Sequence, residues 1–325
     1  MSCKFALAIL SDIHYACAAE QAAGDDYEYR GLANPLLRWT VRLYRHHIWM
    51  RYPLRHNAQL DRFLAHVGPV DYVIANGDYA VDTAASGVSD AAVRQSAEEC
   101  LSKLRRQFGD KLITGFGDHE LGKLPLFGLR GGMRLASWRS AVDELGLRPF
   151  WKLELGNYVL MGVVSSLVAL PVFEHDRLPA EQSAWEELRA GHIAEIRAAF
   201  AALQPQQRVL LFCHDPTALP FLWREDIVRG KLAHVEQTII GHLHSNLFLR
   251  KSKLLAGMPV IRFLGHSIRR MSVGLNEARL WRHFHVRLCP SLAGIELLKD
   301  GGYLTAELDA AAERPARFEF HRLRR

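Results

Sequence analysis

Short runs of apolar residues recur along the chain, and longer stretches with helical spacing separate them. The apolar runs lie at residues 5–10, 72–75, 111–114, 158–164, 208–213 and 238–240, and their length and composition are typical of buried strands. Apolar positions at helical spacing occupy residues 91–108, 135–145 and 181–203. Strands that alternate with helices in this way predict an α/β fold.

Acidic and histidine side chains follow the apolar runs in a fixed order. In chain order these residues are Asp12, His14, Asp78, Asp118, His214, His242 and His244. Each of them stands at or just beyond the end of a predicted strand. Because the ends of neighbouring strands meet at one edge of a sheet, we expect the side chains to converge there.

Three carboxylates and four imidazoles are the ligands that two divalent cations need when they share a bridging group. A single Asp-x-His or Gly-Asp pair is ordinary turn chemistry and would indicate little. Two histidines at positions 242 and 244, directly after a glycine, are more specific. The ordered set predicts a dinuclear metal site of the kind that hydrolyses phosphate esters.

Composition is consistent with one large domain. The 325 residues are 49% hydrophobic, and no connection between predicted elements is long enough to be a linker. The five cysteines are scattered, without a C-x-x-C pair, which indicates reduced thiols. The first ten residues lack the features of a signal peptide. We therefore expect a cytoplasmic protein.

Positive charge is concentrated in two segments. No acid occurs between Glu28 and Asp61, or between Glu236 and Glu277. The basic residues there are Arg30, Arg38, Arg42, Arg45, Arg51 and Arg55 in the first segment, and Arg250, Lys251, Lys253, Arg262, Arg269 and Arg270 in the second. This distribution favours an anionic partner, above all a phosphorylated substrate, with nucleic acid as a weaker alternative.

Residues 34–56 resemble an insertion between the first two ligand motifs. Residues 36–50 have the spacing of an amphipathic helix, on which Arg38, Arg42 and Arg45 share a face while Trp39 and Trp49 are placed for a membrane interface. The simpler interpretation is a helix that packs on the protein itself. The membrane interpretation rests on the absence of balancing acids, and it predicts peripheral association with the inner face of the membrane.

The ligand motifs together resemble those of the calcineurin-like metallophosphoesterase family, whose pattern is D-x-H, G-D, G-N-H-[DE], H and G-H-x-H. The resemblance extends from about residue 8 to residue 245 and implies a four-layer α/β/β/α sandwich with the dinuclear site at the carboxyl ends of the strands. It implies that Asp12, His14 and His244 hold one ion, that Asp118, His214 and His242 hold the other, and that Asp78 bridges both. Mn²⁺ is the expected metal, with Fe or Zn²⁺ as alternatives.

The same resemblance assigns the catalytic roles. His119 is expected to face the substrate and to stabilise developing charge or protonate the leaving oxygen, while Glu120 accepts a hydrogen bond from His119 and orients it. The expected reaction is attack by a metal-bridging hydroxide on a phosphoester or pyrophosphate. Two further residues are weaker candidates: His266 for substrate contact and Asp82 for a supporting carboxylate.

One residue departs from the family pattern. Asp118 stands where the family usually has Asn, so the site gains a negative charge. We expect this charge to tighten cation binding and to weaken the Lewis acidity of the metal.

The substrate remains open between several interpretations. The basic insertion is similar in character to that of UDP-2,3-diacylglucosamine pyrophosphohydrolases, which favours a membrane-associated nucleotide-sugar lipid. A cyclic-nucleotide phosphodiesterase or a nuclease of the same family is the alternative. A non-catalytic scaffold that binds membrane or nucleic acid is an alternative of another class, which the complete ligand set disfavours.

Overall fold

Two five-stranded sheets packed face to face form the centre of the protein. The computed structural model describes residues 3–125, 131–263 and 265–324. The first sheet has the strand order β10-β9-β1-β2-β3, and the second β4-β5-β6-β7-β8. The strands are β1 Lys4–Leu10, β2 Tyr72–Ala75, β3 Leu112–Thr114, β4 Trp151–Leu155, β5 Tyr158–Val163, β6 Arg208–Cys213, β7 Val235–Ile240, β8 Val286–Leu288, β9 Gly302–Asp309 and β10 Arg317–Arg322.

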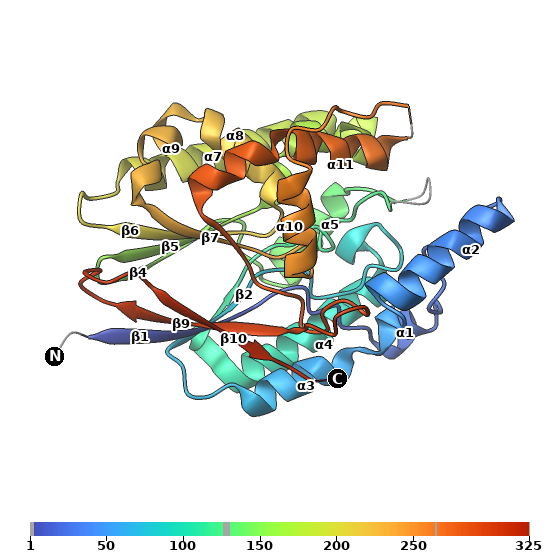
Figure 1. Cartoon of the computed structure of the whole chain (residues 1–325), viewed down its shortest axis with the longest axis horizontal. Helices are drawn as coiled ribbons and strands as arrows, with labels where there is room; N and C mark the ends of the chain where they lie inside the picture. Colours follow the sequence, from blue (N-terminus) through green and yellow to red (C-terminus); the bar gives the residue numbers. More distant parts are fainter. Residues whose placement is uncertain (1–2, 126–130, 264, 325) are drawn as a thin grey trace.

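Helices cover the outer faces of both sheets, which gives four layers (Figure 1). Helices α3 and α4 lie against the first sheet, and α7, α8, α9 and α11 lie over the second (Figure 1). The helices are α1 Ala18–Gln21, α2 Pro35–Tyr44, α3 Asn57–His66, α4 Ala91–Phe108, α5 Leu135–Arg139, α6 Ser165–Val168, α7 Gln182–Ala201, α8 Leu219–Arg224, α9 Asp226–Gly230, α10 Asn246–Leu254 and α11 His266–Glu277. The predicted four-layer α/β/β/α arrangement is confirmed.

Short 3₁₀ and π segments connect these elements. The π segments are Arg45–Trp49 and Ser140–Glu144. The 3₁₀ segments are Pro53–Arg55, Gly87–Ser89, Gly109–Lys111, Leu170–Asp176, Pro179–Glu181, Pro216–Ala218, Leu232–His234 and Ala278–Phe284.

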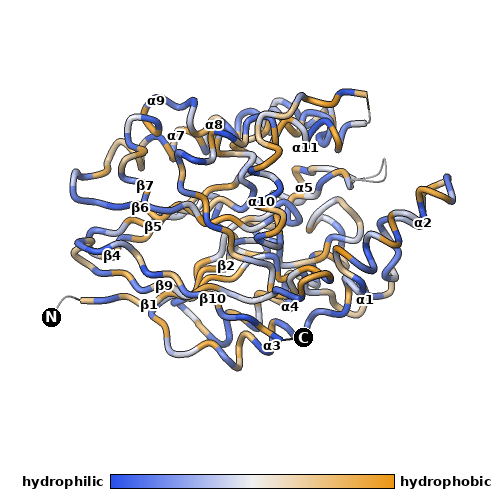
Figure 2. The backbone as a smooth tube through the Cα atoms, viewed as in Figure 1, coloured by the Kyte–Doolittle hydropathy of each residue, from blue (hydrophilic) through white to orange (hydrophobic). Residues whose placement is uncertain are grey.

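Apolar side chains fill the space between the two sheets. Ile9 on β1, Ile74 on β2, and Leu210 and Phe212 on β6 are fully or almost fully buried in one cluster. Hydrophobic residues gather around strand β2, whereas β9 and β10 alternate hydrophobic with hydrophilic residues (Figure 2). The opposite faces of the strands pack against the helices, which is why several strands read as continuous apolar runs in the sequence.

Parallel pairing brings the ligand-bearing strand ends to one edge. β1 pairs with β2 and β2 with β3, all parallel, while β5, β6 and β7 form a second parallel set. Parallel neighbours end on the same side, so the loops after β1, β2 and β3 meet at one edge of the first sheet and those after β6 and β7 at one edge of the second. The packing of the two sheets brings these edges together.

Several predicted boundaries differ from the structure. The helix expected over residues 36–50 ends at Tyr44, continues as a π turn and stops at Met50, whose backbone is extended. The helix expected over 135–145 likewise changes to a π turn at Ser140. The strands β4, β8, β9 and β10 were not predicted.

Helix α2 projects from the body of the protein (Figure 1). Asn34 caps its first turn by accepting hydrogen bonds from the N–H groups of Leu36 and Leu37, and Pro35 occupies the first helical position. Leu36 is 70% exposed and Trp39 is 58% exposed. Of the helix residues, only Val41 is buried. The end of the inserted segment, by contrast, packs onto the body through Met50 and Leu54.

Candidate metal centre

The seven expected ligand residues lie together at the carboxyl edge of the two sheets. Five of them have a left-handed backbone with positive φ, although none is glycine: Asp12 (50°), His14 (50°), Asp78 (57°), His242 (58°) and His244 (57°). Such a conformation costs free energy for an L-residue, and it persists only where the surroundings require it. Here it turns the ends of β1, β2 and β7 so that side chains from successive positions face one cluster.

Asp12, His14 and His244 form the first group of ligand atoms. His244 Nε2 lies 3.1 Å from His14 Nε2 and 3.3 Å from Asp12 Oδ1. His14 Nε2 lies 3.9 Å from the same oxygen. Two ligands on a tetrahedral ion with bonds near 2 Å are about 3.3 Å apart. The three atoms therefore have the separation that a shared cation requires.

Asp118, His214 and His242 form the second group. Asp118 Oδ1 lies 3.3 Å from His214 Nε2 and 3.0 Å from His242 Nδ1. Within each of the two groups, all ligand atoms are within 4.8 Å of one another.

Asp78 lies between the two groups. Its Oδ2 is 3.1 Å from His214 Nε2. A carboxylate oxygen of Asp78 lies within 4.8 Å of the ligand atoms of Asp12 and His214. A carboxylate oxygen of Asp78 is likewise within 4.8 Å of the ring nitrogens of His14 and His119. This position fits the bridging role that the family resemblance implies.

Backbone contacts fix the loops relative to one another. Asp12 N–H donates to Gly77 O (3.1 Å), and His14 N–H donates to Asp78 O (3.0 Å). A Cβ at Gly117 would lie 2.0 Å from Asp78 Oδ1, so only glycine permits this approach. The loops after β1, β2 and β3 are thus held as one unit.

Hydrogen bonds also set which ring nitrogen of two histidines faces the cluster. His214 Nδ1 is 2.7 Å from Asn76 O, and His14 Nδ1 is 3.3 Å from Ala80 O. Because a carbonyl only accepts, each Nδ1 carries the proton and each Nε2 presents a lone pair. Among the described residues, His214 Nε2 and Asp12 Oδ1 are buried without a hydrogen-bond partner. Buried atoms of this kind are suited to binding a cation.

The electrostatics of the cluster also favour the binding of cations. Burial raises the pKa of Asp12 to about 6, and burial lowers the pKa of His14 to about 3. Burial and Asp118 would raise the pKa of Asp78, but His119 and His214 hold it below its ordinary value. Burying three carboxylates together is costly unless positive charge accompanies them. The donor set, with oxygen and nitrogen atoms only, fits divalent metal ions.

His119 lies beside the cluster, but Glu120 does not orient it. His119 Nδ1 is 2.6 Å from Val81 O, and its Nε2 is 3.8 Å from Asp78 Oδ2. Glu120 instead accepts hydrogen bonds from the N–H groups of Gly117, Asp78 and Tyr79 at 2.7–3.0 Å. The expected Glu120–His119 hydrogen bond is therefore wrong, because this buried carboxylate satisfies backbone donors of two ligand loops. Burial raises the pKa of Glu120 to about 7.

The two weaker candidates have other surroundings. Asp82 accepts hydrogen bonds from Ser86 N–H and Gly87 N–H, so it stabilises a turn and is no ligand-supporting carboxylate in this structure. His266 begins α11, and its ring lies 4.0 Å from that of His175, centroid to centroid.

Lys123 is a residue of this site that sequence reasoning missed. Its Nζ forms an ion pair with Asp118 Oδ2. The other carboxylate oxygen, Oδ1, is the one that faces His214 Nε2 and His242 Nδ1. Burial would lower the pKa of Lys123, but Asp118 and Asp78 raise it above its ordinary value. The only sequence signal is a basic residue directly after the turn at Gly122.

The contacts of Trp49 and Arg45 differ from those predicted for the inserted segment. The Trp49 ring lies tilted beside the ring of His244 and is half-buried, so it packs against the metal centre and differs from the exposed Trp39 of α2. Arg45 is buried and pairs with Glu28 at 3.0 Å, which removes it from the expected basic face. Asp25 similarly pairs with Arg55 at 3.5 Å. Acids that precede the insertion in the sequence therefore balance part of its charge.

No protein-family model matches the chain, and no curated protein sequence matches it. Among solved structures, it is similar to the phosphopantetheinyl hydrolase from Mycobacterium tuberculosis, at 17% identity and a TM-score of 0.36 over 75% of this chain and 84% of that one. A purple acid phosphatase from yellow lupin seeds matches at 12% identity and a TM-score of 0.36, over 75% of this chain and 38% of that one.

A metallophosphoesterase from Sphaerobacter thermophilus matches at 12% identity and a TM-score of 0.32, over 97% of this chain and 87% of that one.

Proposed function

We propose that the protein is a metal-dependent hydrolase of phosphoesters or pyrophosphates. The observation that carries the proposal is the pair of ligand groups with Asp78 between them, in which His14 Nε2 and His244 Nε2 approach to 3.1 Å. Two adjacent sites for divalent cations, joined by one carboxylate, are the arrangement that phosphate-ester hydrolysis uses.

The residues present fit two divalent ions. Asp12, His14 and His244 would hold one, Asp118, His214 and His242 the other, with Asp78 shared. Bound ions would supply Lewis acidity, which activates water at neutral pH and offsets charge on the phosphoryl oxygens. Mn²⁺ is our first candidate, and Fe and Zn²⁺ suit the same donors.

His119 is the residue proposed to act on the substrate. Its Nδ1 contact with Val81 O fixes the ring and leaves Nε2 directed toward the cluster. From there, Nε2 can stabilise charge on the reacting phosphate or, in the protonated ring, give a proton to the leaving oxygen. Glu120 contributes by holding the loops of Asp78 and Asp118 in register.

The test is metal-dependent hydrolysis across a substrate panel. Protein stripped with a chelator is supplied with Mn²⁺ or Zn²⁺ and assayed for phosphate products from aryl phosphoesters, cyclic nucleotides and nucleotide-sugar lipids. Asp12→Ala should lose the activity, whereas Asp61→Ala, which changes an exposed carboxylate on α3, should keep it. Stoichiometric metal binding without hydrolysis of any substrate would favour the scaffold alternative.

For the substrate, we propose an anionic lipid-linked phosphate presented at a membrane. Support comes from α2, where Leu36, Leu37 and Trp39 are exposed beside Arg38 and Arg42. The segment before α11, where Phe263 is 84% exposed, lies toward the same end of the molecule (Figure 1). Exposed apolar side chains beside arginines are typical of a helix that binds an anionic membrane. Among the described residues, no helix is long and apolar enough to span a bilayer.

This second proposal has its own test. Replacing Arg38 and Arg42 by Gln should lower the partition coefficient for vesicles of anionic phospholipid, measured by co-sedimentation, by about 30-fold, at about 1 kcal/mol for each arginine. The matched control replaces two exposed arginines elsewhere, Arg106 and Arg317, and should retain binding. If the wild type does not bind vesicles at low ionic strength, the cyclic-nucleotide or nuclease alternative is favoured.

A further inference from the structure

The two carboxylate oxygens of Asp118 have different partners. Oδ1 faces the imidazole nitrogens of His214 and His242, at 3.3 and 3.0 Å. Oδ2 faces away from these rings and pairs with the ammonium group of Lys123. Only 2% of the Asp118 side chain is exposed, so each oxygen depends on the partner that the protein supplies.

A tight turn brings Lys123 back to this oxygen. The N–H groups of Leu121 and Gly122 both donate to Asp118 O, at 3.3 and 3.0 Å, so the chain reverses directly after the motif. Gly122 has φ +84°, and a Cβ there would lie 2.6 Å from the backbone of Ser86. The turn therefore requires glycine, and it places Lys123 beside Asp118.

The pair changes the charge of the metal centre. Asp12, Asp78 and Asp118 carry three negative charges, and Lys123 returns one positive charge at Asp118. The net charge then equals that of a centre with two carboxylates and a neutral oxygen ligand in place of Asp118. The Asp118 side chain is 2% exposed and the Lys123 side chain 25%, so solvent screens this ion pair only partly and the compensation is effective.

We infer that Lys123 is a positioning residue for the second metal ion, because it neutralises Asp118 Oδ2 and leaves Oδ1 to act as a neutral-like oxygen ligand for a divalent cation. Asp118 and Lys123 then form one functional unit, which corrects our expectation that the charge of Asp118 by itself tightens cation binding. This inference rests on the proposed metal-dependent function.

The experiment is a double-mutant cycle on metal affinity, with Asp118→Asn, Lys123→Met and the combined variant. Mn²⁺ is titrated calorimetrically into chelator-stripped protein without substrate, and thermal unfolding confirms that each variant folds. Asp118→Asn leaves the positive charge of Lys123 beside a cation site, so it should weaken the affinity for the second Mn²⁺ ion by about tenfold or more. Lys123→Met leaves the carboxylate charge uncompensated and should tighten the binding of that ion. The double variant should return to within about threefold of the wild type.

A second Lys–Asp pair serves as the matched control. Lys103 Nζ contacts Asp61 Oδ1 at 2.6 Å between α4 and α3, where both groups are more exposed. Lys103→Met, Asp61→Asn and their combination should leave Mn²⁺ affinity unchanged.

Three outcomes separate the possibilities. If the wild type binds two Mn²⁺ ions and the effects of Asp118→Asn and Lys123→Met on Mn²⁺ affinity are additive, the two residues are not coupled. This result would overturn the inference and leave the proposed hydrolase function intact. A Lys123→Met variant that raises only KM, with normal Mn²⁺ affinity, would make Lys123 a substrate contact and also overturn it. A wild type that binds neither Mn²⁺ nor Zn²⁺ would overturn the proposed function together with this inference.

Discussion

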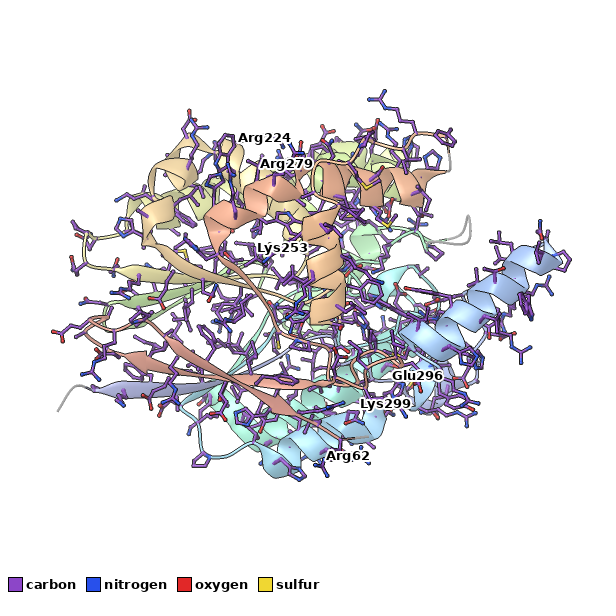
Figure 3. All side chains as sticks on the ribbon, viewed as in Figure 1. Arg62, Arg224, Lys253, Arg279, Glu296 and Lys299 are labelled. Atoms are coloured by element: carbon purple, nitrogen blue, oxygen red, sulfur yellow. The ribbon has the colours of Figure 1, made fainter. Side chains whose placement is uncertain are left out.

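The ring of Trp49 lies 4.6 Å from the ring of His244, centroid to centroid, at an angle of 36°. Trp49 also meets Phe248 of α10 edge to face at 5.0 Å. Its carbonyl accepts a hydrogen bond from Glu296 N–H at 2.7 Å, in the loop before β9 that carries Glu296 and Lys299 in Figure 3. The inserted segment thus contributes one wall of the metal centre, and α2 is joined to that wall through the π turn.

Trp49→Ala should weaken metal binding and turnover together. Loss of the ring frees His244 to move, and supporting contacts of this kind are worth about 10–100-fold in metal affinity. Trp39→Ala is the matched control, since Trp39 belongs to the same segment but is exposed. Calorimetric titration of Mn²⁺ into each variant checks this, and equal affinities for both would show that the Trp49 contact is incidental.

Asp78→Ala should lose at least one of two metal equivalents. Asp78 shares one set of ligand atoms with Asp12 and His214 and another with His14 and His119, so its carboxylate is placed to serve both ligand groups. Metal analysis of the purified variant by mass spectrometry measures the loss. Retention of two full equivalents would exclude the bridging role.

His119→Ala should keep both metal equivalents and lose turnover by about 10²–10⁴-fold on an ester with a poor leaving group. The loss should be smaller on an activated aryl ester, because such a leaving oxygen needs no proton. Equal losses on the two esters would indicate charge stabilisation alone. Loss of a metal equivalent would instead make His119 a ligand, which its place in a group with His14 and Asp78 permits.

Acid should destabilise the fold through His192, far in sequence from the ligands. His192 on α7 is buried, accepts a hydrogen bond from Val164 N–H at 3.0 Å, and has its pKa lowered by burial to about 4. The unfolded chain takes up a proton below pH 6.5, while the folded one stays neutral until about pH 4. Stability is therefore lost as pH falls through this window, by up to about 3 kcal/mol.

His192→Gln isolates this contribution. Glutamine can accept the Val164 hydrogen bond but does not titrate, so denaturant unfolding of the variant should depend less on pH between 6.5 and 4. His47→Gln, at an exposed position, should follow the wild type. Parallel pH curves for His192→Gln and wild type would contradict the assignment.

The ligand set could be predicted because it depends on local sequence and simple topology. Asp12, Asp78 and His214 each stand within three residues of a strand end. Parallel pairing aligns the strand ends within each sheet, and packing of the two sheets brings the two sets of ends together. Glu120 shows the limit of this reasoning. Its position next to His119 suggested a contact, but its carboxylate reaches the backbone of another loop.

Contacts across long connections could not be predicted. The acid-free segment of the insertion is balanced by Glu28, which lies outside it in sequence but meets Arg45 in space. Trp49 and His244 are almost 200 residues apart in sequence, and no periodicity encodes the contact between their rings. The edge strand β10 and its neighbour β9 lack a ligand motif that would have marked them, and β10 is mostly exposed.

The pairing of β1 with β9 also sets an order of events during translation. β1 lies between β2 and β9, with Phe5 opposite Leu308 and Ile9 opposite Leu304. The ribosome therefore releases all seven ligand residues while the β9 side of β1 still has unpaired N–H and C=O groups. A nascent chain in that state presents an open strand edge, which is prone to wrong pairing. Synthesis of residues 302–309 covers that edge, so β1 is paired on both sides only after all seven ligand residues have been made.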